Sequence, residues 1–185
     1  MKTVNSILIS FLASLMLLTL GGCISSKPTT SYLLREDDTA PKQYANAVII
    51  DSVQLAGYLE RPNPVRRIGR NTVDFYPNMV WAQDIRSMLK ETLVNNLLLR
   101  NSHSTDAKKY HAIVHFLRLE VDENSKKFIV NAVCYMRCEK ENYKKHFVYG
   151  YDCAGCTDEK LINFYDKALS ELADKLSEMA EGSGK

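Results

Sequence analysis

The sequence predicts an α+β fold in which a single antiparallel or mixed sheet is covered by two amphipathic helices. Three observations support this: two segments with helical apolar spacing, three consecutive strand-like segments between them, and short β-branched runs before the first helix. The expected element order is β-β-(β)-α-β-β-β-α. The composition agrees, because 45% hydrophobic and 25% charged residues are typical of a globular chain of 185 residues. The formal net charge of +2 implies no nucleic-acid partner.

Short strands are expected before the first helix. Residues 31–34 form a brief apolar run, and residues 47–55 are rich in β-branched side chains. Residues 65–68 and 71–75 are expected to form two further short strands around Gly69.

Two amphipathic helices are expected, one over residues 78–100 and one over residues 157–180. In both segments apolar side chains recur at steps of three and four residues, which places them on one helix face. Thr157 is suited to cap the second helix, and Gly182 stands just beyond its last apolar position, as a C-terminal stop would. The expected core-facing positions are Trp81, Ile85, Met88, Leu89, Leu93 and Leu97 in the first helix and Leu161, Tyr165, Ala168, Leu169, Leu172, Leu176 and Met179 in the second.

Three consecutive strands are expected between the helices. Residues 110–122 end in an alternation of apolar and charged side chains, as a half-buried strand does. A polar turn at residues 123–125 leads to a second strand at residues 128–138. Another polar turn, at residues 139–145, leads to a third strand at residues 146–152. Strands joined in this way form an antiparallel meander.

Residues 1–22 have the layout of a secretory signal peptide: a basic start, an apolar run and then small residues. The adjoining sequence Leu20-Gly21-Gly22-Cys23 resembles a lipobox, the site where bacterial lipoproteins are cleaved and lipidated. An ordinary signal peptide with a chance cysteine, or an uncleaved anchor, is the alternative. Processing at the lipobox would leave Cys23 as an acylated N-terminus, residues 23–30 as a tether, residues 31–181 as the folded domain and residues 182–185 as a tail.

Acyl chains on Cys23 would anchor the domain stably in a lipid bilayer. The residue after the cysteine is Ile24 rather than the Asp that retains lipoproteins in the inner membrane of Gram-negative bacteria. In a host that follows this sorting rule, the protein is expected at the outer membrane, facing the periplasm.

Four further cysteines are Cys134, Cys138, Cys153 and Cys156, and an even number in an exported domain favours disulfides. Cys134 and Cys138 lie on one expected strand, roughly 13 Å apart, which is too far for a bond. We therefore expect one of them to pair with Cys153 or Cys156, which would tie the middle strand of the meander to the last helix. The alternatives are a four-thiolate zinc site, a reactive dithiol at Cys153 and Cys156, or reduced thiols without a role.

No hydrolase motif, zinc-protease motif or glycine-rich phosphate loop occurs in the sequence. Apart from the thiols, no catalytic residue, cofactor or metal site is expected, and the protein is not expected to be an enzyme. His111 and His115 share one face of an expected strand and are interpreted as ordinary imidazoles, with a metal-binding pair as the alternative.

Arg61, Arg66, Arg67 and Arg70 lie within one short segment. Guanidinium groups bind phosphates and carboxylates through paired hydrogen bonds. The segment is either a solvated loop and edge strand protected by charge, or a contact surface for anionic lipid headgroups or an acidic protein.

Several short motifs occur in one order along residues 31–100. They are Ser31-Tyr32-Leu33-Leu34, then Tyr58-Leu59-Glu60-Arg61-Pro62, then Val65-x-Arg67-x-Gly69-x-Asn71, then Trp81-Ala82. In this order, after a lipobox, they resemble the PqiC/YmbA family, the ABC-type transport auxiliary lipoproteins.

The resemblance implies a non-catalytic lipoprotein that assists the transport of phospholipid or another hydrophobic substrate. Its implied partners are an MCE-domain protein and an inner-membrane ABC permease or PqiA-like protein, and it could form homo-oligomers. The segment from Tyr58 to Asn71 would be the shared contact surface. The alternatives are a periplasmic thiol-disulfide oxidoreductase using Cys153 and Cys156, and a general envelope-assembly lipoprotein.

Overall fold

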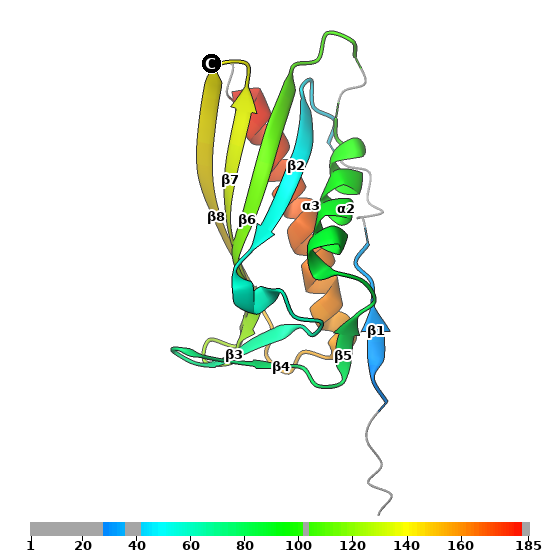
Figure 1. Ribbon diagram of the computed structural model, residues 1–185, viewed down its shortest axis with the longest axis vertical. Helices are drawn as coiled ribbons and strands as arrows, with labels where there is room; N and C mark the ends of the chain where they lie inside the picture. The colour runs from blue at the N-terminus through cyan, green and yellow to red at the C-terminus, as the bar shows by residue number, and fades with distance from the viewer. Residues whose placement is uncertain (1–27, 36–41, 102–103, 183–185) are drawn as a thin grey trace, which may run out of the picture.

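The protein was analysed in a computed structural model that describes residues 28–35, 42–101 and 104–182. These residues form a twisted sheet with two helices on one of its faces (Figure 1). The expected signal peptide, the lipidation site Cys23 and most of the expected tether lie outside the described residues. In the described ranges, no helix combines the length and the apolar character needed to span a membrane.

The main sheet confirms the predicted meander and adds two parallel neighbours to it. Its strand order is β4-β3-β6-β7-β8, and β2 also pairs with β6. The long strand β6 is antiparallel to β7. Strand β2 pairs in parallel with the first part of β6, and β3 pairs in parallel with the last part of β6. The strands are β2 (Ala47–Leu55), β3 (Val65–Gly69), β4 (Thr72–Phe75), β6 (Lys109–Asp122), β7 (Lys127–Cys138) and β8 (Glu141–Asp152).

The third strand of the meander begins earlier than predicted. The polar segment that suggested a long turn belongs to β8, which is paired with β7 from Glu141 onward. A turn of only two residues connects the strands, with Glu139 at a φ of 52°. Such a left-handed backbone suits a tight hairpin. The segment is polar because β8 is an edge strand with many exposed side chains, so its polarity does not indicate a loop.

A small second sheet lies where the sequence predicted the start of the first helix. Strand β1 (Thr30–Tyr32) pairs in parallel with β5 (Met79–Trp81). The predicted helical start at residue 78 is therefore wrong, and Trp81 is a strand residue. Its indole packs edge-on against the ring of Tyr165, with ring centroids 5.0 Å apart.

Helix α2 (Ile85–Leu98) begins where a capping residue allows it. The Asp84 carboxylate accepts a hydrogen bond of 2.9 Å from the Ser87 backbone N–H. Helix α3 (Asp158–Gly182) follows the meander as predicted. A short 3₁₀ helix, η1 (Gly57–Leu59), joins β2 to the segment before β3.

The core lies between the helices and the face of the sheet that they cover. Leu93 of α2, Phe116 of β6, Phe128 of β7 and Leu172 of α3 are completely buried there. Alternate residues of β7 point into this core, and the residues between them point to the opposite face. Within the described ranges, no helix lies over that opposite face (Figure 1).

Helices α2 and α3 are also joined by a polar contact. The guanidinium of Arg100, at the end of α2, is buried and lies 2.8 Å from the Asp174 carboxylate. It also donates a 2.8 Å hydrogen bond to the Ser170 hydroxyl. The two helices therefore form one layer, held by apolar packing and by this charged contact.

Candidate docking surfaces

The arginine-rich segment predicted as a contact surface is largely engaged within the protein. Arg67 lies in β3 beside β6, and its guanidinium is 2.6 Å from the Glu120 carboxylate. Arg118 contacts the same carboxylate at 2.7 Å. The Glu120 side chain has no exposed surface, so the two arginines balance a buried charge.

Tyr58 is part of the same cluster. Its hydroxyl donates a hydrogen bond of 3.0 Å to the Leu117 carbonyl, and the Arg67 guanidinium lies 6.0 Å from the centre of its ring. Burial, together with the nearby charge of Glu120, raises the pKa of Tyr58 to about 12. Tyr58 therefore links η1 to β6, which is a structural role.

Arg66 has an internal partner as well. It lies 2.6 Å from the Asp74 carboxylate on the neighbouring strand β4. The hydrogen bond from Arg66 holds the pKa of Asp74 below its usual range. The remaining candidates of the segment, Arg61, Arg70 and Asn71, have exposed side chains. The structure thus divides the six predicted contact residues into an engaged group and an exposed group.

The cysteine pairing differs from the prediction. Cys153 and Cys156 form a disulfide with each other, with Cα atoms 5.0 Å apart, and Cys134 and Cys138 are free. The expected cross-link between the middle strand and the last helix is therefore wrong. The loop closes on itself because Gly155 has a φ of +65° and the Cys156 N–H donates a 3.2 Å hydrogen bond to the Cys153 carbonyl.

The remaining thiols do not form the alternative zinc site. Cys134 points into the core, where burial raises the pKa of its thiol to about 12. In the part of the chain that the structure describes, no three His, Cys, Asp or Glu side chains come together to hold a metal ion. His111 instead pairs with Asp51, at 2.9 Å between Nδ1 and Oδ1.

A second surface, which the sequence reasoning missed, covers the face of the sheet opposite the helices. We call it the open sheet face. Its exposed fractions are 60% for Val148, 44% for Tyr135 and 36% for Leu117. Val133 lies between them together with the polar residues His115, Asn131 and His146. The apolar members of the open sheet face are Ile113, Leu117, Ile129, Val133, Tyr135 and Val148.

A signal for this face was present in the sequence. Strand β7 has apolar residues on both of its faces. Ile129, Val133 and Tyr135 lie on the face away from the core. Strands with one solvated face usually alternate apolar and polar residues. Apolar residues on both sides predict that something covers both faces.

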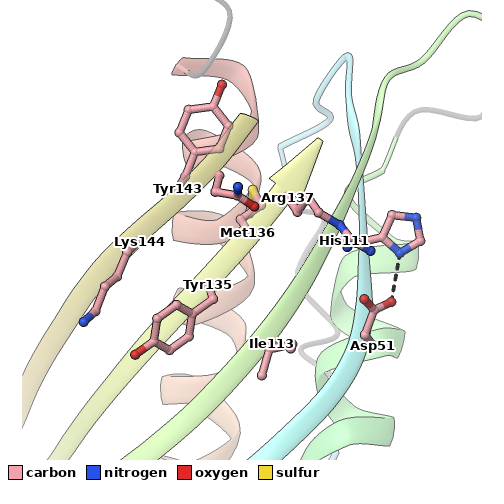
Figure 2. A pocket seen from close by; sticks show the side chains of 9 residues that line it. Asp51, His111, Ile113, Tyr135, Met136, Arg137, Tyr143 and Lys144 are labelled. Carbon is pink, nitrogen blue, oxygen red and sulfur yellow. Dashed lines mark hydrogen bonds and ion pairs between the residues drawn. The ribbon is translucent and has the colours of Figure 1, made fainter. Parts of the chain in front are cut away.

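One end of the open sheet face is hollowed (Figure 2). The hollow has a volume of about 400 Å³, and its walls come from four strands. The Lys144 ammonium lies 5.2 Å from the centre of the Tyr135 ring. The side chains that define the hollow are Asp51 of β2, His111 and Ile113 of β6, Tyr135 and Arg137 of β7, and Lys144 of β8.

Comparison with known proteins identifies a family and solved structures of similar fold. A model of the ABC-type transport auxiliary lipoprotein component family matches residues 32–177. This match confirms the resemblance seen in residues 31–100. None of the curated proteins matches the chain.

Two solved structures share the fold at low sequence identity. A crystal structure described only as an uncharacterized protein has a TM-score of 0.65 and 11% identity, over 83% of this chain and 99% of the other. Protein XCC0632 from Xanthomonas campestris, of family model DUF330, has a TM-score of 0.61 and 13% identity. That alignment covers 80% of this chain and 92% of the other.

Proposed function

Because the chain belongs to the family of ABC-type transport auxiliary lipoprotein components, we propose that it assists an envelope transport system by docking to partner proteins, without catalysing a reaction itself. The proposed cargo is phospholipid or another hydrophobic substrate. The observation that carries the proposal is the family match over residues 32–177, which includes both helices almost entirely and every strand of the main sheet. The proposed partners are an MCE-domain protein and an inner-membrane ABC permease or PqiA-like protein.

The proposed location is the outer membrane, with the domain facing the periplasm. Lipidation of Cys23 would supply the anchor, since several acyl chains on one residue bind a bilayer stably. The described chain starts near β1, which lies at the same end of the molecule as β3, β4 and β5 (Figure 1). A short tether would therefore hold this end nearest the membrane. Membrane fractionation of wild type and Cys23→Ala tests the location, with loss of the variant from the outer membrane as the expected result.

A thiol-disulfide oxidoreductase is the second candidate, and one observation favours it. The Cys153–Cys156 disulfide closes a loop directly before the N-terminal end of α3, a position that lowers thiol pKa values in dithiol enzymes. Cys153 is only 4% exposed, however, which leaves little access to a protein substrate. Docking is therefore the function that the molecule supports better.

In-cell crosslinking of the tagged, lipidated full-length protein separates the two functions. Mass spectrometry of the captured proteins should find an MCE-domain protein or its permease. A Cys153→Ala/Cys156→Ala variant serves as the control and should capture the same partners. Mixed disulfides with many unrelated periplasmic proteins, lost in the control, would instead establish the oxidoreductase.

A further inference from the structure

We propose that the open sheet face is the docking surface, and that its occupant is an amphipathic, acidic segment of a partner protein. This proposal rests on the proposed function only in assuming that the protein acts by docking. It assigns the contact to the meander strands rather than to the arginine-rich segment, three of whose side chains are engaged internally.

The first argument is the apolar character of the face. Val148, Tyr135 and Leu117 expose between about a third and two thirds of their surface and lie on the same face of three adjoining strands. Val133 lies between Tyr135 and the other two, with His115 and His146 on either side of it. Apolar side chains gathered on one exposed face, with polar residues around them, mark an interaction site. The helices bury the other face of the same strands, so the open face is the one available to a partner (Figure 1).

The second argument is that none of the described residues covers the open sheet face (Figure 1). The described residues near residues 36–41 contact the helix side of the sheet. Arg35 donates its N–H to Asp166 of α3 at 2.9 Å, and the Tyr44 N–H bonds to the Arg100 carbonyl at the end of α2 at 2.9 Å.

The third argument is charge. Arg137 and Lys144 are exposed at the hollow, and among the described residues neither has an ion pair with a carboxylate. Asp51, the acidic residue of the hollow, is already paired with His111 at 2.9 Å. Among the described residues, Arg137 and Lys144 therefore lack carboxylate partners, and carboxylates from outside would complement them.

Charge and apolar surface together define the occupant. A segment with apolar side chains along one side and Asp or Glu along the other would cover the apolar residues of the open sheet face. Its carboxylates would pair with Arg137 and Lys144. A second copy of this chain stacked on the same face would bring its own Arg137 and Lys144 to the hollow, where Asp51 is already paired with His111. The face therefore fits a different protein better than it fits itself.

Photo-crosslinking in cells tests the assignment. A photoreactive amino acid is placed at position 148 or 117 of the lipidated full-length protein, and at position 163 on exposed α3 as the control. The crosslinked peptides are then sequenced by mass spectrometry. The expected result is one apolar, acidic segment of another protein, captured from positions 148 and 117 and not from position 163.

Charge reversal provides a matched test. Lys144 and Lys160 are both exposed, and each ammonium lies over an aromatic ring, at 5.2 Å from Tyr135 and 5.7 Å from Phe164. Arg137→Glu/Lys144→Glu should lower the crosslinking yield at position 148 about tenfold. Lys160→Glu should leave it unchanged. Circular dichroism of the purified variants checks that the fold is retained.

Several results would overturn the proposal. One is crosslinking of this same chain or of lipid at positions 148 and 117, and another is no crosslinking at either position. Crosslinking at position 163 equal to that at positions 148 and 117 would also contradict it, as would a crosslinking yield that the charge reversal does not change. Failure of the proposed function looks different, because no MCE-domain protein or permease would then be captured from any position. Capture of such a partner by general crosslinking in cells, with none from positions 148 and 117, would leave the proposed function intact and refute docking at the open sheet face.

Discussion

The ion pairs of Glu120 with Arg67 and Arg118 stabilise the contact between β3 and β6. The carboxylate is buried, while the side chains of Arg67 and Arg118 keep 19% and 31% of their surface exposed. Removing one member of a fully buried ion pair costs about 3–5 kcal/mol. Water can reach the two arginines here, so the loss should lie somewhat below that range.

We predict that Glu120→Gln lowers the free energy of unfolding by about 2–3 kcal/mol, measured by urea denaturation. Asp74→Asn is the control, because the Arg66–Asp74 pair is much more exposed and should matter less. An equal decrease in the free energy of unfolding in the two variants would show that burial of Glu120 does not strengthen its ion pairs.

Asp122 makes stability depend on pH. Burial alone would raise its pKa, but hydrogen bonds from Arg118 and from the backbone N–H groups of Ser125 and Asn124 lower it below 3.8. A carboxylate with a lowered pKa stabilises the fold above its unfolded-state pKa, and this stabilisation disappears as the pH falls through the folded-state value.

Asp122→Asn should therefore be less stable than wild type at pH 7, and the difference should shrink as the pH falls below 3.8. Denaturant unfolding at a series of pH values measures this. A difference that stays constant down to the lowest pH would contradict the assigned hydrogen bonds.

Cys134 should be chemically inert in the folded protein. Its thiol is completely buried, and its pKa is raised to about 12, so little thiolate exists at pH 8. Iodoacetamide at pH 8, followed by peptide mass spectrometry, should leave Cys134 unmodified until urea unfolds the chain. Rapid modification under native conditions would place this thiol outside the core.

At the scale of the elements, a disulfide within the loop between β8 and α3 joins two residues of that same loop. The Cys153–Cys156 bond joins residues three positions apart, so it restricts the unfolded chain much less than a long-range disulfide would. The predicted cross-link to β7 would have joined two separate elements. The observed bond only shapes the turn that leads into the last helix.

Cys153→Ala/Cys156→Ala should accordingly lower the free energy of unfolding by at most about 2 kcal/mol and leave the fold intact. Urea unfolding and circular dichroism measure the two quantities. A variant that fails to fold would show that this short loop organises more of the domain than its contacts suggest.

For the whole molecule, the layer of two helices determines which face of the sheet is available. Leu172 of α3 is completely buried between the layers, whereas Leu98 at the end of α2 is 55% exposed. Leu172→Ala should lower the free energy of unfolding by about 2–5 kcal/mol, and Leu98→Ala should change it by about 0.5 kcal/mol or less. Thermal or urea unfolding compares them, and similar effects would contradict the assigned layering.

Local patterns in the sequence determined much of the architecture. The apolar spacing predicted most of α2 and nearly all of α3, and strand-like runs placed β2, β3, β4, β6 and β7 within a few residues. The ordered motifs of residues 31–100 were enough to identify the family. These features depend on residues close together in the chain, so periodicity and motif order reveal them.

Tertiary structure alone decided the features that depend on distant partners. Trp81 fits the helical spacing of the residues after it, but pairing of β5 with β1 makes it a strand residue. The sequence suggests that Arg66 and Arg67 are available to an outside partner, but each forms an ion pair within the protein, with Asp74 and Glu120 respectively. The apolar residues on both sides of β7 are visible in the sequence, but pairing with β6 and β8 alone decides that Leu117 and Val148 join them on the open sheet face.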